Sequence, residues 1–367
     1  VEAYLEYEEM TDEEKELTAK ENSLEQEYEQ LSSEEFYYEY DGEEWDLNRL
    51  NMEADEMDHD AVVEIYQGIC KQRNDAVGEV FVELVDVRNE IAKLNGYDNY
   101  AEYAYDAVYV RDYTLDETRD LLKEIRKHVV PVMADMKDVL NDTDYMRLYS
   151  EGQGIESTSI IEQIGPYLEE IDPELKDTQE HFLKYRLYDM DTSQNKANTA
   201  FTMRLSYFKD GFIYGQMYDN YMDYYNVIHE FGHYNNVYRS ADTFFESSNN
   251  IDVSEIHSQG MQILFYDYYD ELLGEDIGDI YAFYDVYSMA DNAISTALIS
   301  EFEIAAYENP DMTLEELNKL YLQLSRRYGM QYDSKIKELY TWSEVPHIFT
   351  SPCYYFSYLT SAFSSCL

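Results

Sequence analysis

The chain of 367 residues is long enough to bury a large core, which excludes a mini-protein or a disulfide scaffold. It carries 78 acidic side chains against 26 basic ones, a formal charge of -52. Such a field repels phosphate backbones and anionic lipid surfaces, so nucleic acid is excluded as a partner. Because 45% of the residues are hydrophobic and 16% are aromatic, the chain can still bury surface, and we expect it to fold.

Three cysteines, Cys70, Cys353 and Cys366, are too few and too scattered for a disulfide framework. No apolar run approaches the roughly 18 to 20 residues that span a bilayer, so we predict no membrane insertion. The chain begins with Val1, has no signal-peptide pattern, and contains few Lys but many Tyr, Asp and Asn residues. This composition favours a bacterial extracellular or cell-surface location over the cytoplasm. We expect a monomer or a weak oligomer.

The N-terminal third of the chain is predicted to be helical. Residues 1–60 hold 24 acidic side chains and are predicted to form an acidic helical arm. Apolar residues recur at three- and four-residue steps over residues 61–94, which predicts one long helix or two nearly collinear ones. Thr114 and Glu117 form a capping-box pattern that opens a further helix, bent or interrupted at Pro131.

The pattern changes once, over residues 198–217. Here Thr and aromatic residues flank Lys209-Asp210-Gly211, which predicts a turn and the one clear hairpin of the chain. Helical patterns then return, and they predict helices over residues 224–237, 254–273, 277–309 and, from a second capping box, 313–329. The predicted fold class is mainly α with a small β-sheet.

Residues 229–233 have the sequence His-Glu-Phe-Gly-His. On a helix, positions i and i+4 differ by about 40° around the axis, so His229 and His233 can present imidazoles to one metal ion while Glu230 lies at its rim. This pattern is typical of zinc peptidases, although two His and a Glu also occur on ordinary surface helices. Gly232 costs roughly 1 kcal/mol against Ala in a helix interior, which indicates a close packing or functional need.

A catalytic zinc takes three protein ligands and keeps one position open for water. Glu255, at the start of a predicted helix, can supply the third ligand. A metzincin would need Gly and His where Asn236 and Arg239 stand, so that class is excluded. His257 is predicted to face away from the metal, and Gln259 is a candidate for orienting a ligand.

Three separated motifs resemble those of the M3 peptidases, the family of oligoendopeptidase F and thimet oligopeptidase. They are the HEFGH sequence, the stretch Asp252-Val253-Ser254-Glu255-Ile256-His257-Ser258-Gln259, and Val345-Pro346-His347 with Tyr354-Tyr355-Phe356-Ser357-Tyr358. Residues 198–226 also resemble the strand pair that precedes the zinc helix in that family. The resemblance extends from Trp45 to Tyr358. Family members have more helical sequence on either side, so we expect a less enclosed substrate channel.

The resemblance implies a large helical metallopeptidase fold with a small sheet beside the zinc helix and a deep central channel. It implies one Zn2+ per chain, held by His229, His233 and Glu255, with Glu230 activating a water molecule. We assign residues 61–197 to a helical lobe and 198–367 to a catalytic lobe.

The resemblance also implies donors that stabilise the oxyanion of the transition state, namely His347, Tyr355 and Tyr358. The predicted hairpin could bind an extended peptide by strand addition, through Gly211, Phe212 and Ile213. The implied function is zinc-dependent endopeptidase activity on short unstructured oligopeptides. Two alternatives stay open, a carboxypeptidase or dipeptidyl carboxypeptidase of the same helical superfamily and a non-catalytic peptide-binding protein.

Overall fold

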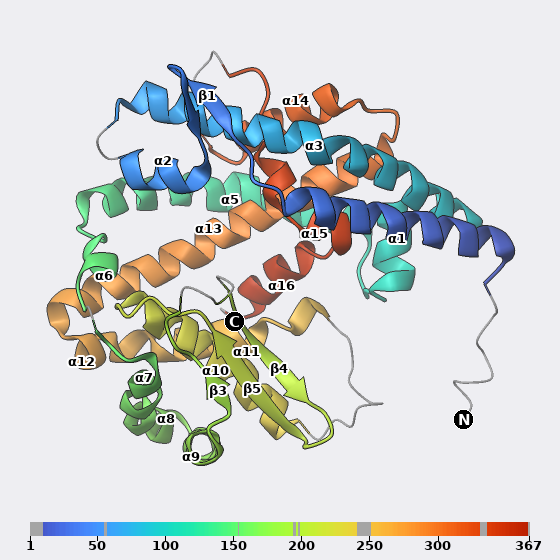
Figure 1. Cartoon of the computed structure of the whole chain (residues 1–367). Helices are drawn as coiled ribbons and strands as arrows, with labels where there is room; N and C mark the ends of the chain where they lie inside the picture. The colour runs from blue at the N-terminus through green and yellow to red at the C-terminus, as the bar shows by residue number, and fades with distance from the viewer. Residues whose placement is uncertain are drawn as a thin grey trace. The chain divides into compact units, whose positions relative to one another are not determined.

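The computed structural model describes residues 10–54, 57–152, 154–193, 196, 199–240, 251–330 and 336–365. Asn198, the predicted start of the hairpin, Cys366 and the first nine residues of the acidic arm lie outside these ranges. The described chain is mainly helical with two small sheets, which confirms the predicted fold class (Figure 1). None of the described helices is long and apolar enough to cross a bilayer.

The chain divides into two compact units. Unit 1 comprises Val1–His128 and Thr296–Tyr355, and unit 2 comprises Val129–Ser295 and Phe356–Leu367. These limits differ from the three segments expected from the sequence, because each unit is assembled from distant parts of the chain. The three segments as functional lobes stay a prediction.

Unit 1 is a helical unit with one short hairpin. Its elements are α1 (Asp12–Ser32), β1 (Tyr38–Tyr40), β2 (Glu43–Trp45), α2 (Leu47–Glu53), α3 (His59–Leu94), α4 (Tyr100–Tyr103), the π-helical turn η3 (Ala104–Val108), the start of α5 (Leu115–Asp142), the end of α13 (Glu275–Glu308), α14 (Leu314–Arg327), η6 (Thr341–Glu344) and α15 (His347–Thr350).

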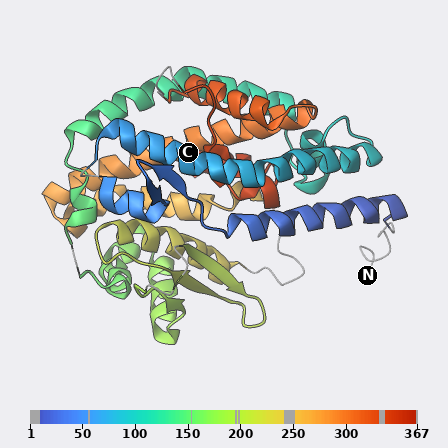
Figure 2. The same cartoon turned by 45° about the horizontal axis from the view of Figure 1, so that its top comes forward.

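The predicted helix over residues 61–94 is confirmed as the single helix α3. Its buried apolar residues recur on one face, and α1 runs beside it in unit 1 (Figure 2). Arg88 of α3 is fully buried and pairs with Glu21 and Glu25 of α1, at 2.7 and 2.9 Å. Part of the acidic arm therefore neutralises a buried cation and is not simply a solvated face.

Local capping signals locate two of the helix starts. Thr114 and Glu117 exchange the hydrogen bonds of a capping box, as do Thr313 and Glu316. Helix α5 continues through Pro131 to Asp142. The hairpin β1-β2 was not expected from the sequence, because its strands are only three residues long and do not show a clear alternation.

Unit 2 packs helices around a three-stranded sheet. Its elements are the end of α5, α6 (Arg147–Ser150), α7 (Ser157–Gln163), α8 (Gly165–Ile171), α9 (Pro173–Tyr185), β3 (Tyr188–Asp189), β4 (Ala200–Leu205), β5 (Asp210–Gly215), α10 (Met222–Arg239), η4 (Ile251–Val253), α11 (Ile256–Phe265), η5 (Tyr266–Tyr268), α12 (Tyr269–Leu273), most of α13 and α16 (Phe356–Ser365).

The predicted hairpin is the antiparallel pair β4-β5, and the strand order of its sheet is β3-β5-β4. Strand β5 already begins at Asp210, which pairs with Leu205, so the turn is formed by residues 206–209 and not by 209–211 as predicted. Lys209 takes the left-handed conformation that closes this turn, with φ 52°. Strand β5 is the central strand, and β4 pairs only with β5 within the described part of the chain.

Helix α10 is anchored in the core of unit 2 by one of its faces. Val227, Ile228, Phe231 and Tyr234 are fully buried there, in the cluster that also contains Ile213 of β5.

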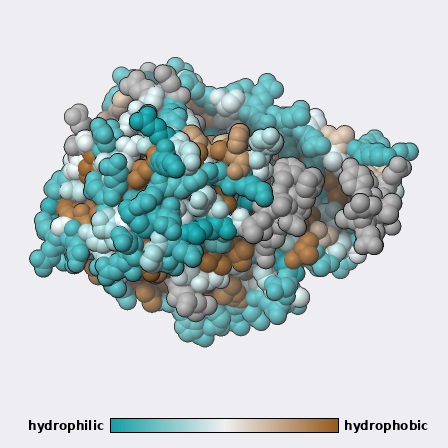
Figure 3. Space-filling model, turned by 90° about the horizontal axis from the view of Figure 1, so that it is seen from below, coloured by the Kyte–Doolittle hydropathy of each residue, from teal (hydrophilic) through white to brown (hydrophobic). Residues whose placement is uncertain are grey.

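On the molecular face drawn in Figure 3, hydrophilic residues predominate and hydrophobic areas are small and separate, as the charge excess leads one to expect.

Candidate metal centre

Two helices of unit 2, α10 and α11, pack closely at Gly232. A Cβ atom added to Gly232 would lie 2.7 Å from the Cα atom of Ser258 and closer still to the carbonyl oxygen of His257. Only glycine permits this approach, which explains why α10 accepts a residue that weakens an isolated helix. The contact brings Glu255, at the N-terminus of α11, against the face of α10 that carries the two histidines.

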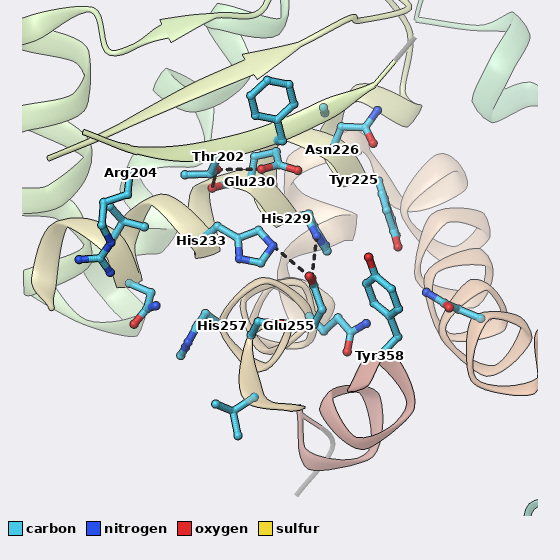
Figure 4. Close-up of a pocket in the computed structure, with 18 residues that line it drawn as sticks. Thr202, Arg204, Tyr225, Asn226, His229, Glu230, His233, Glu255, His257 and Tyr358 are labelled. Atoms are coloured by element: carbon cyan, nitrogen blue, oxygen red, sulfur yellow. Dashed lines mark hydrogen bonds and ion pairs between the residues drawn. The ribbon is translucent and has the colours of Figure 1, made fainter. Parts of the chain in front are cut away.

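The three predicted metal ligands meet at one point in the structure. The Oε2 atom of Glu255 lies 3.3 Å from the Nε2 atom of His229 and 3.1 Å from that of His233 (Figure 4). Among the described residues, these three form a group whose ligand atoms lie within 4.8 Å of one another. Two ligands held 2.0–2.1 Å from a tetrahedral zinc are about 3.3 Å apart, so the side chains fit one such ion.

The electrostatics of this group favour an ionised carboxylate. Burial alone would raise the pKa of Glu255, but the hydrogen bonds and charges of His229 and His233 hold it well below its usual range. Burial opposes the charged form of His229, yet Glu255 raises the pKa of that imidazole. The hydroxyl of Ser258 donates to the same Oε2 atom at 2.9 Å and fixes the carboxylate.

A buried polar chain orients His229 from behind. The Oε1 atom of Gln262 lies 3.0 Å from Nδ1 of His229, and the Gln262 amide donates to Asp285 at 3.2 Å. Tyr269 donates to the other oxygen of Asp285 at 3.1 Å. Because the Gln262 amide group is committed to Asp285, its oxygen accepts from Nδ1–H of His229, which leaves Nε2 as the ligand atom.

Sequence reasoning missed Gln262 and pointed to Gln259 instead. The Oε1 atom of Gln259 is buried and has no hydrogen-bond partner among the described residues. Gln262 follows Glu255 by seven residues, two helical turns, and therefore lies on the same face of α11. Following that face one turn further would have identified it.

Glu230 is held beside the histidines by the sheet. Its side chain is buried, and the hydroxyl of Thr202 on β4 donates to its Oε2 atom at 2.7 Å and to its carbonyl oxygen at 3.0 Å. Nothing in the sequence marked Thr202, because this contact depends on how β4 packs against α10.

A cavity of about 840 Å³ within unit 2 opens onto this group. Residues of β4, α10, α11, α13 and α16 line it, and they include all three candidate ligands, Glu230 and Tyr358. His257 also lines the cavity, with its ring directed away from the three candidate ligands (Figure 4).

The predicted peptide-binding residues Gly211, Phe212 and Ile213 are not brought to this cavity. They belong to the central strand β5, whose backbone pairs with β4, and Ile213 is fully buried. The cavity is instead lined by Ala200, Phe201 and Thr202 of β4, one of the two edge strands of the described sheet.

The late His and Tyr residues are divided between the units. Tyr358 on α16 belongs to unit 2, and its hydroxyl points toward the part of the cavity that holds His229 and Tyr225 (Figure 4). Hydrogen bonds from Ser357 to Asp252 at 2.6 Å and from Ser361 to its carbonyl at 2.9 Å fix α16 beside the segment leading to Glu255.

His347 and Tyr355 belong to unit 1, where their rings lie 5.2 Å apart. Burial lowers the pKa of His347 and raises that of Tyr355, so both are neutral hydrogen-bonding groups near pH 7. Their relation to the metal ligands stays a prediction.

No family model matches the chain, and none of the curated proteins matches it. Several solved structures do match the chain. A protein assigned as an oligoendopeptidase F is 24% identical, with a TM-score of 0.75 over 97% of this chain and 66% of its own. PZ peptidase A, with an inhibitor, is 24% identical, with a TM-score of 0.77 over 97% of this chain and 67% of its own.

A further solved structure, assigned as an oligoendopeptidase F from Bacillus anthracis str. Ames, is 22% identical, with a TM-score of 0.71 over 97% of this chain and 65% of its own. The chain thus has the large helical fold of these peptidases. It spans about two thirds of their length.

Proposed function

We propose that the chain is a zinc-dependent endopeptidase of the M3 type that hydrolyses peptide bonds in short, unstructured oligopeptides. The observation that carries this proposal is the convergence of His229, His233 and Glu255, with ligand atoms within 4.8 Å of one another, in a cavity that also holds Glu230. The likeness in fold to oligoendopeptidase F and PZ peptidase A supports it.

The three side chains would hold one zinc ion per chain. When bound, zinc supplies a Lewis acid that acidifies a water molecule and polarises a peptide carbonyl. Gln262 keeps the ligand nitrogen of His229 turned toward the site, and Ser258 keeps the Glu255 carboxylate in place. Both contacts hold the ligands in one geometry before substrate arrives.

Glu230 is the base and later the acid of the proposed reaction. Its carboxylate takes a proton from the attacking water and returns it to the departing amine. Thr202 supports this role, because its hydroxyl binds one carboxylate oxygen and leaves the other free to face the cavity. The free edge of β4 would pair with an extended peptide and position the scissile bond beside Glu230.

Tyr358 would donate to the oxygen on which negative charge develops. A phenol stays neutral at pH 7, and one such donor is worth about 3 to 4 kcal/mol in the transition state. We assign the same task to His347 and Tyr355, on the strength of the motif that they share with Tyr358.

Metal analysis of the purified chain, combined with cleavage of a quenched fluorogenic peptide blocked at both termini, tests the proposal. We expect one zinc per chain and cleavage that a chelator abolishes and added zinc restores. Only an endopeptidase cuts a peptide blocked at both ends, so cleavage of the unblocked peptide alone would favour a carboxypeptidase. Stoichiometric zinc in a His229→Ala, His233→Ala double variant would refute the ligand assignment.

A further inference from the structure

The cavity around the candidate ligands contains one unusual charge. Among the described residues, Arg204 is the one Lys or Arg side chain in its lining, which also contains the carboxylates of Glu230 and Glu255. Figure 4 places Arg204 beyond His233, on the opposite side of the cavity from Tyr225 and Tyr358. This positive side chain at one end of the cavity contrasts with the formal charge of -52 of the whole chain.

Arg204 has no carboxylate partner in the described part of the chain. Its Nη2 atom donates to the hydroxyl of Ser240 at 3.0 Å, a neutral acceptor that binds one of its five N–H groups. Two other arginines of unit 2 are paired with carboxylates, Arg239 with Glu174 at 3.1 Å and Arg147 with Glu151 at 2.7 Å. Arg204 therefore keeps donors for a further acceptor.

The position of Arg204 on β4 sets its distance from Thr202, which contacts Glu230. Thr202 and Arg204 are two residues apart, so both project from the same face of the strand, toward α10. Thr202 reaches Glu230, whereas Arg204 reaches Ser240 at the end of that helix. Two strand residues span about 7 Å, and His233 and Ser240 are about 10 Å apart along the helix axis.

From these observations we infer that Arg204 recognises a carboxylate of the bound peptide, two or three residues away from the scissile bond. The inference rests on the proposed function, because it assumes a peptide extended along β4. The carboxylate is either a Glu or Asp side chain or the free C-terminus of the peptide. A guanidinium forms paired, charge-assisted hydrogen bonds with either group and none of comparable strength with an amide.

The test compares matched peptides in a background without turnover. Glu230→Gln protein, loaded with zinc, is titrated with fluorescent peptides that carry Glu or the isosteric Gln at each position in turn, and with peptides ending in a free acid or an amide. We expect Kd to be about five- to tenfold lower for one carboxylate peptide than for its neutral partner. Adding Arg204→Gln should abolish the difference, and Arg204→Glu should turn it into a preference for Lys.

Lys209→Gln is the matched control, since it removes one positive charge from the exposed turn of the same hairpin. It should preserve the carboxylate preference. Equal Kd ratios with and without Arg204, or an equal loss in the Lys209 variant, would overturn the inference. Binding is measured without catalysis, so a carboxylate preference in a protein whose parent cleaves no peptide would refute the proposed function and leave the recognition by Arg204 standing. Peptides with an acidic side chain and peptides with a free C-terminus identify which carboxylate is bound.

Discussion

The close contact at Gly232 makes the metal centre sensitive to a single methyl group. In Gly232→Ala the new Cβ atom would lie 2.7 Å from Cα of Ser258, whereas ordinary contacts begin at about 3.4 Å. The obstacle is backbone, so no side-chain rotation relieves it. Helices α10 and α11 must therefore separate by at least about 0.7 Å, the difference between the two distances, because the carbonyl oxygen of His257 lies closer still.

This separation acts directly on the ligands. Adding this minimum of 0.7 Å to the present distances of 3.1 and 3.3 Å puts the Glu255 oxygen at least about 3.8 to 4.0 Å from the two imidazole nitrogens. That is wider than the roughly 3.3 Å that tetrahedral zinc requires. We expect zinc affinity to fall about 10- to 100-fold, and kcat/KM of the loaded protein by about 100-fold. Overpacking should cost about 1 to 3 kcal/mol, partly offset by about 1 kcal/mol of helix propensity.

Zinc affinity is measured by competition with a chromophoric chelator, and stability by urea unfolding of the metal-free protein. Gly260→Ala on α11 is the matched control, because its added Cβ would meet nothing within 4 Å. It should bind zinc normally and gain about 0.5 to 1 kcal/mol of stability. Unchanged zinc affinity in Gly232→Ala, with Gly260→Ala behaving as expected, would refute the link between helix approach and ligand geometry.

Four further substitutions test the roles assigned to other single residues. Glu230→Gln should keep zinc and lower kcat by about 100- to 10,000-fold; near-normal cleavage would remove it from the mechanism. Gln262→Leu should weaken zinc binding about 10- to 100-fold, and an equal effect of Gln259→Leu would speak against the buried polar chain. Tyr358→Phe should lower kcat and kcat/KM together by about 100-fold with zinc content unchanged; a loss of stability alone would mean a packing role. Burial raises the pKa of Glu303 in unit 1 to about 7, above its unfolded value, so the native state keeps a proton that the unfolded state has lost. The contribution of Glu303 to stability therefore declines as pH rises from about 4.5 to 7. In urea titrations at different pH values, Glu303→Gln should remove about 3 kcal/mol of that decline. An identical pH dependence of stability in both proteins would contradict this role of Glu303.

Elements with local signals were predictable from the sequence. Helix α3 follows from its apolar periodicity, and the starts of α5 and α14 follow from their capping boxes, because these signals lie within a few residues of the structure that they determine. For Gly232 the sequence left a close packing need and a functional need open, and it did not indicate which segment packs against this residue.

Features that depend on strand pairing or helix packing were not predictable in this way. The hairpin β4-β5 was expected, but the third strand β3 made β5 central and left β4 at one edge of the described sheet. Thr202 carries no sequence signal of its own, since it acquires its contact only when α10 meets β4. Gln262 has only its helical spacing from Glu255 as a signal, and its contact with His229 forms when α10 meets α11.

The candidate metal geometry is set by helix packing rather than by loop conformation. Glu255, which caps α11, and Ser258 and Gln262 within it lie three and four residues apart and share the face that packs on α10. One residue is a candidate ligand, the next fixes its carboxylate, and the third orients an imidazole of the opposite helix. The face of α11 that packs on α10 thus positions two of the three candidate ligands, Glu255 and His229. Because Gly232 has no side chain, this face can also approach the third candidate ligand, His233. Substitutions that change the approach of these helices should therefore impair metal binding even where they contact no ligand.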